Sequence, residues 1–126
     1  MNKSITLAAL VVAMTMAASG NVLAHGEKPK HGGVIQAAND LSFELVNKDG
    51  KATIYVEDHG KPVSTAGATG KLTVLNGAEK SEVPLEPAGD NMLATKGEAK
   101  LGKDAKAIAA MTFADKNAVN VRFSMK

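Results

Sequence analysis

The chain has 126 residues, of which 15 are Lys or Arg, 13 are Asp or Glu and three are His, and its sequence contains no Cys and no Trp. This length is typical of a single domain. Because Cys is absent, disulfide frameworks, thiolate zinc sites, iron–sulfur clusters and cysteine nucleophiles are excluded, and a metal site would have to use His, Met, carboxylate or backbone donors.

The N-terminus has the parts of a secretory signal peptide. Lys3 gives a positive start, residues 5–18 form an apolar run, and Val22 and Ala24 are small or aliphatic residues before a cleavage point. The apolar run is shorter than the roughly 20 residues that a membrane-spanning helix needs. We therefore expect residues 1–24 to be removed on export to the periplasm, with no stable membrane insertion afterwards.

The exported chain begins with a segment of unusual composition. Residues 25–33, with the sequence HGEKPKHGG, include no core-forming residue and predict a flexible N-terminal arm ahead of a folded domain at 34–126. The charge of the exported chain would be close to neutral. No basic cluster with interleaved aromatic residues is present, so the sequence does not predict nucleic-acid binding.

After the arm, short strand-like runs alternate with turn signals. The runs cover residues 34–38, 41–45, 52–57, 71–75, 81–85, 92–95 and 118–124. The turns between them include Asp49-Gly50 and Asn76-Gly77, which are strong hairpin signals, while Pro84 and Pro87 indicate a sheet edge or a strand end.

Residues 105–113 are ambiguous. Their alanines favour a helix, but Ala109, Met111 and Phe113 alternate with Ile108, Ala110 and Thr112, as on the two faces of a strand. A hairpin turn at 115–117 follows, so we predict a strand here, with Met111 in the core. About seven short strands without a convincing helix predict an all-β fold, an antiparallel β-sandwich of immunoglobulin-like (Ig-like) topology in preference to a barrel.

Three stretches resemble a known group of proteins. They are KDGKATIYVEDHGKPVSTAGATGKLTVLNG, EVPLEPAGDNMLAT and the HGG at residues 31–33. Over residues 31–126 the chain resembles small periplasmic Ig-like proteins, and homologous appended domains, associated with heavy-metal efflux systems of the resistance-nodulation-division (RND) type. The resemblance implies a periplasmic location and a connection with copper, silver, cobalt, zinc or related cations, and it implies no reaction. Its matching segments are His31-Gly32-Gly33 and Asp58-His59-Gly60.

Two histidines of the arm are candidate metal ligands. Cleavage after Ala24 would make His25 the first residue, so that its α-amine and imidazole could chelate one ion, and His31 could fold back to add a third nitrogen. Such nitrogen donors suit Cu(II) and other divalent transition metals, with copper bound most tightly. The alternative is that both are solvated histidines of an exposed arm.

Three further residues are weaker candidates. His59 follows Asp58 in a predicted turn, where the carboxylate could orient the ring or share a cation with it, although Asp-His-Gly is also an ordinary hydrophilic turn. Met92 follows another turn and offers a thioether of the kind that binds Cu(I) or Ag(I).

Enzymatic patterns are scarce in this sequence. No Ser lies in a G-x-S-x-G motif, and no Gly-rich phosphate loop opens a helix, so we expect no enzymatic activity. The favoured interpretation is a periplasmic copper-binding protein that buffers the metal or delivers it to an efflux system. The alternative is a non-catalytic module that docks on an RND efflux adaptor or another periplasmic protein and has no metal site of its own.

Overall fold

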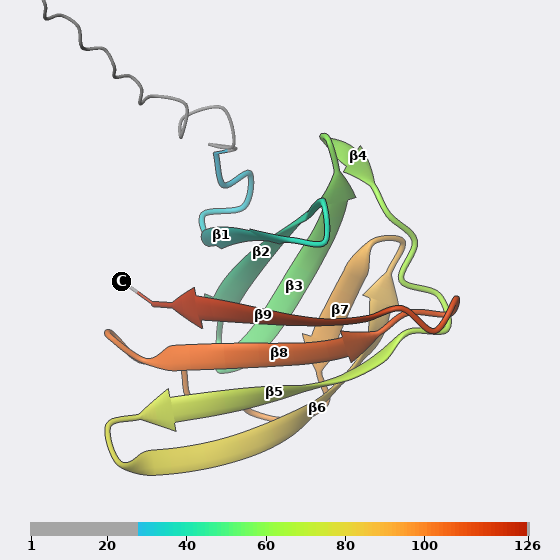
Figure 1. Ribbon diagram of the computed structural model, residues 1–126. Helices are drawn as coiled ribbons and strands as arrows, with labels where there is room; N and C mark the ends of the chain where they lie inside the picture. The colour runs from blue at the N-terminus through green and yellow to red at the C-terminus, as the bar shows by residue number, and fades with distance from the viewer. Residues whose placement is uncertain (1–27, 126) are drawn as a thin grey trace, which may run out of the picture.

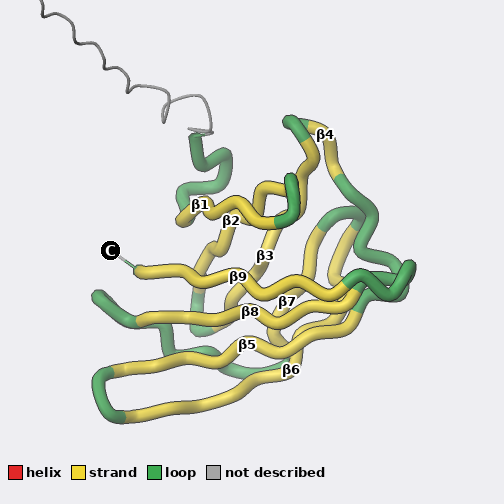
Figure 2. The backbone as a smooth tube through the Cα atoms, in the orientation of Figure 1, coloured by secondary structure: helices red, strands yellow, loops and turns green. Residues whose placement is uncertain are grey.

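The structure, a computed structural model, describes residues 28–125. The predicted signal peptide at 1–24 and the candidate ligand His25 lie outside these residues. Within the described part the chain consists of strands joined by turns and short loops (Figure 2). No helix long and apolar enough to cross a bilayer is found among residues 28–125.

Residues 28–125 contain nine strands. They are β1 (Val34–Ala38), β2 (Leu41–Lys48), β3 (Lys51–Asp58), β4 (Lys61–Pro62), β5 (Thr69–Asn76), β6 (Glu79–Gly89), β7 (Met92–Thr95), β8 (Lys106–Thr112) and β9 (Ala118–Ser124). All neighbouring strands pair antiparallel, in the order β1-β2-β3-β7-β6-β5-β8-β9, with β4 added to β3.

The sheet curls until its first and last strands lie side by side, so that its two halves face each other across one core (Figure 1). The predicted all-β antiparallel fold is therefore confirmed. In the described part of the chain there are nine strands, where the sequence predicted about seven, and they form one continuous, nearly closed sheet.

Left-handed turn residues determine two of the hairpins, and the sequence predicted the one at Asp49-Gly50. Between β2 and β3, Asp49 and Gly50 both have positive φ, 54° and 80°, which is the geometry of a two-residue turn that matches the twist of the flanking strands. Asn39 and Asp40 form the corresponding turn between β1 and β2, with φ of 52° and 64°. Asn and Asp tolerate this left-handed region better than other residues with a side chain.

The alanine-rich segment is a strand, as predicted, and not a helix. In β8 the side chains of Ala107, Ala109 and Met111 are buried while their neighbours face outward. The helix preference of alanine is overridden by tertiary context, because β8 pairs with β5 on one side and β9 on the other.

The two prolines of β6 lie at positions where their missing N–H group interrupts no ladder of backbone hydrogen bonds between strands. Pro84 pairs with β5, but its carbonyl accepts a 3.0 Å hydrogen bond from the N–H of Lys96, which follows β7. The proline nitrogen points to that same side, so no bond to β5 is lost. Pro87 adjoins an irregularity in the β6–β7 register, where a missing N–H is tolerated.

The core is continuous and draws on both halves of the sheet. Its fully buried large side chains include Phe43, Leu45, Ile54, Val56, Leu72, Val74, Leu93, Met111 and Phe123. The alternation that the sequence showed in β2 and β9 is thus the alternation of core and outer face.

Candidate functional site

A buried carboxylate lies on the outer face of the sheet. Glu44 belongs to β2, between the core residues Phe43 and Leu45, so its side chain points away from the core. Nevertheless Glu44 is only 5% exposed. It is covered by residues 30–33, which precede β1 and bind it.

Four N–H groups of this segment surround the carboxylate. The backbone N–H groups of Lys30, His31 and Gly33 donate to it at 3.0, 2.8 and 2.9 Å. The imidazole Nδ1 of His31 lies 3.0 Å from Oε1 of Glu44. The sequence predicted a flexible arm for residues 25–33, whereas residues 30–33 have these specific partners on β2. Composition could not reveal these contacts, because residues 30–33 bind Glu44 mainly through their backbone N–H groups.

The protonation state of Glu44 follows from this environment. Burial by itself would raise the pKa of Glu44, but the hydrogen bonds from Gly33, His31 and Lys30 together hold the pKa below its ordinary value of 4.5. At neutral pH the group is therefore a carboxylate, which can only accept hydrogen bonds. It follows that Nδ1 of His31 carries the proton in this contact.

The ring of His31 is held in a second way by Tyr55. The two ring planes are 3° apart and their centroids are 3.7 Å apart, which is a stacked arrangement. Tyr55 is the cross-strand neighbour of Glu44, so both residues lie on the same outer face. The His31 side chain is still 39% exposed, and its Nε2 has no hydrogen-bond partner among residues 28–125.

Gly33 allows the segment to lie this close to the sheet. A Cβ at this position would overlap the backbone carbonyl of Leu45. The second glycine of the HGG segment is therefore required by close backbone approach, and its role is to seat His31 on β2.

Lys30 closes the site on its other side. Its ammonium group lies 3.0 Å from Oε1 of Glu57, the outward-facing residue two positions after Tyr55. The space left between Lys30, Glu44, Tyr55 and Glu57 is about 10 Å³, which is room for one water molecule at most. We call residues 30–33 with Glu44 and Tyr55 the His31 cluster.

The other predicted ligands lie elsewhere. His59 has the left-handed φ of 53° in the turn after β3, and its Nδ1 lies 2.6 Å from Oδ1 of Asp58. That ring is 85% exposed. Met92 begins β7 next to Tyr55 in the register, and its methyl group covers the α-carbon of Gly89.

The structure thus does not gather the candidates into one complete site. Within residues 28–125 no group of three or more His, Asp and Glu side chains is arranged to hold a metal ion. Both histidines of residues 28–125 have Nδ1 beside a carboxylate, but within this part of the chain only the His31 ring is also stacked on an aromatic neighbour and held by a buried carboxylate.

Two residues of the His31 cluster could not be identified from the sequence. Glu44 and Tyr55 occupy ordinary outward positions of two alternating strands. The one available signal was the pair of glycines after His31, because such glycines indicate that the backbone closely approaches another segment of the protein. Which residue it approaches depends on the β1–β2 register, and the sequence does not determine that register uniquely.

Comparison of the chain with family models, with curated proteins and with solved structures found no match.

Proposed function

We propose that this protein binds a transition-metal ion, copper in preference to others, through His31, and that it buffers the metal in the periplasm or delivers it to an efflux system. The proposal rests on the orientation of His31. Metal-binding histidines characteristically donate their second ring N–H to a carboxylate, which fixes the tautomer and makes the other nitrogen a better ligand. Glu44 stands in this relation to His31, and Nε2 is the ring nitrogen without a partner among residues 28–125.

The metal is cargo in this proposal and takes part in no reaction. Nε2 of His31 supplies one donor, and the described residues supply no complete set with it. The remaining donors would come from the exported N-terminus, where the α-amine and the imidazole of His25 form a nitrogen pair. Exchange of this nitrogen pair for donors on a partner would release the ion without any change in the sheet.

A Cu(II) titration of the exported protein tests the proposal, after mass spectrometry has established its first residue. The sequence contains one Tyr and no Trp, so Tyr55 is the dominant fluorophore and lies in contact with the proposed ligand. We expect stoichiometric quenching of this fluorescence, with a Kd below about 1 μM by calorimetry and a nitrogen-rich paramagnetic resonance spectrum.

Three variants separate His31 from the other candidates. His31→Ala is expected to weaken binding by roughly tenfold or more, because a nitrogen donor is lost. Glu44→Gln keeps the ligand but loses the carboxylate that orients it, so its effect should be in the range of about 10- to 100-fold. His59→Ala is the matched control, and binding to it should equal that of the unchanged protein.

Two results would refute this function. One is binding no tighter than that of an unstructured peptide with two histidines, and the other is equal loss in His31→Ala and His59→Ala. A titration with Cu(I) or Ag(I), which Met92 would suit, then remains as the last metal test. Failure there as well would favour the non-catalytic docking module.

A further inference from the structure

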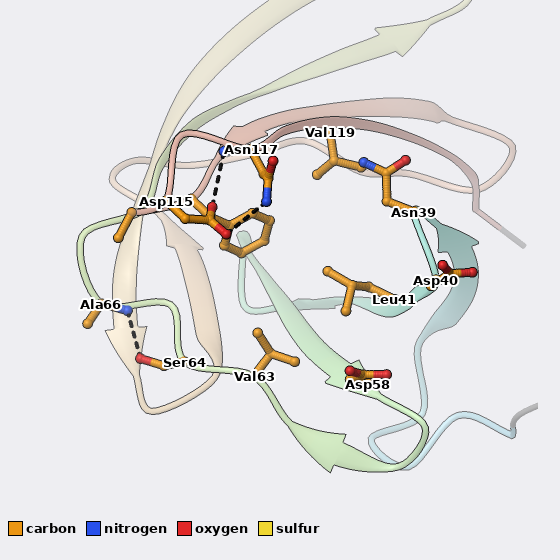
Figure 3. A pocket seen from close by; sticks show the side chains of 12 residues that line it. Asn39, Asp40, Leu41, Asp58, Val63, Ser64, Ala66, Asp115, Asn117 and Val119 are labelled. Atoms are coloured by element: carbon orange, nitrogen blue, oxygen red, sulfur yellow. Dashed lines mark hydrogen bonds between the residues drawn. The ribbon is translucent and has the colours of Figure 1, made fainter.

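A large open pocket lies at one end of the curled sheet (Figure 3). Its volume is about 710 Å³, which is within the usual range for small-molecule sites. The β1–β2 turn, the segment after β4 and the β8–β9 turn surround it, and the end of β3 closes the remaining side. No residue of the His31 cluster lines this pocket.

The floor of the pocket is apolar. Leu41 and Val63 extend into it from opposite chain segments, with Val119 across from them (Figure 3). Phe113 adds an aromatic ring to the lining. Leu41, Val63 and Phe113 are only partly buried and rest on the edge of the core. The pocket therefore offers apolar surface that the fold itself does not cover.

The rim of the pocket carries one sign of charge. Asp40 and Asp58 lie on one side and Asp115 on another (Figure 3). The carboxylate of Asp115 is held in place by the backbone N–H of Asn117 at 3.1 Å and its side-chain amide at 2.8 Å. The residues that line the pocket include three carboxylates and no Lys, Arg or His.

We infer that this pocket binds an amphipathic organic cation, that is, a small molecule with an ammonium group on an apolar body. The apolar floor provides for the body of the ligand, and the carboxylates attract the positive group. Phe113 also lines the pocket, and an aromatic ring attracts an ammonium ion that lies over its face. A lone metal ion would leave the apolar lining unused, and an anion would meet three negative charges.

Benzylammonium is a suitable probe because benzyl alcohol is its neutral counterpart of the same shape and phenylacetate is a similar anion. Each is titrated into the exported, isotope-labelled protein and followed by two-dimensional NMR of the backbone amides. We expect saturable shifts for residues 39–41, 63–66 and 113–119, with a Kd of about 1 mM for benzylammonium. Benzyl alcohol should bind about threefold to fivefold more weakly, and phenylacetate should not bind.

The variant Asp40→Asn/Asp115→Asn tests the carboxylates. Asn tolerates the positive φ of residue 40, and it keeps an oxygen for the N–H of Asn117. Benzylammonium should then bind about as weakly as benzyl alcohol. Asp49→Asn is the matched control, because it makes the same change at a left-handed turn residue that does not line the pocket.

Several results would overturn the inference. They are equal affinity for benzylammonium and benzyl alcohol, shifts that map outside the pocket, unchanged binding in the double variant, or no saturation up to about 10 mM. Binding of a Leu-Lys-Leu peptide without binding of benzylammonium would also overturn it, because the pocket would then recognise a protein segment. The spectra themselves report whether each variant is folded.

Discussion

At the scale of single residues, Glu44 is the side chain on which the N-terminal contacts depend. It binds three backbone N–H groups and one ring nitrogen of a segment that has no apolar anchor. A buried carboxylate costs free energy unless its hydrogen bonds are satisfied, and here they are. This carboxylate therefore converts a polar, glycine-rich segment into an ordered part of the surface.

Glu44→Gln should lower the free energy of unfolding by about 1–3 kcal/mol at pH 7. The amide has nearly the same shape, but it is uncharged, and its NH₂ group faces donors where an oxygen accepted before. Urea unfolding followed by circular dichroism measures the loss. The exposed residue Glu86, on β6, gives the control Glu86→Gln, which we expect to change stability by less than about 0.5 kcal/mol.

The effect of Glu44→Gln should also depend on pH. The pKa of Glu44 is lower in the folded protein than its ordinary value of 4.5, so the folded state is favoured when this group is ionised. That contribution is complete above the ordinary value and disappears as the pH falls through the folded-state pKa. The stability difference between the protein and Glu44→Gln should therefore shrink as the pH falls below about 4.5. A difference that stays constant or grows on acidification would contradict this account.

The candidate site shows where reading residues one at a time is insufficient. His31 was identified because imidazole is a good ligand wherever it lies. Glu44 was not, because a polar residue between Phe43 and Leu45 looks solvent-exposed, and only the approach of residues 30–33 buries it. Burial that comes from a segment 11 to 14 positions away depends on tertiary contacts, which periodicity does not encode.

At the scale of elements, local patterns predicted most strands and their turns, because alternation and left-handed turn residues are local properties. β8 is the instructive case. Its composition favours a helix, whereas its alternation and the hairpin turn at 115–117 favoured the strand that the structure has. The alanines are needed for packing, since Ala107 and Ala109 are fully buried and face the interior of the curled sheet.

Ala109→Leu should therefore destabilise the protein by about 1–3 kcal/mol, because the added methylene groups enter a filled core. Ala110→Leu is the control on the same strand, at a half-buried position of the opposite face. It should cost less than about 0.5 kcal/mol. Both are measured by urea unfolding. If Ala109→Leu were neutral or stabilising, the interior beside β8 would contain a void that the structure does not show.

At the scale of the whole molecule, closure of the sheet could not be foreseen from the sequence. Most of its strands can be found one by one, but their order requires pairings between distant segments, such as β3 with β7 and β5 with β8. Pairings of this kind depend on which strand edges remain free after the hairpins form. A sandwich of two sheets and one curled sheet share the same strand patterns, so the choice between them is made by tertiary packing.

One continuous core should make the two halves of the sheet unfold together. Phe123, on β9, is almost fully buried in the same cluster as Leu45 of β2 and Leu93 of β7. Phe123→Leu leaves a small void, and we expect it to lower the free energy of unfolding by about 1–3 kcal/mol. Native-state hydrogen exchange should show this loss equally at the slowest amides of β3 and of β8.

The equality of the two losses is the informative part of this measurement. If protection fell only in β8 and β9, the halves would be separate cooperative units, and contact between β1 and β9 would not join them. If protection fell equally in both halves, the curled sheet would be one cooperative unit. The His31 cluster on its outer face and the pocket at its end would then both belong to that unit. The exposed residue Asn120 on β9 gives the control Asn120→Thr, which should leave the exchange of both halves unchanged, because its side chain faces solvent.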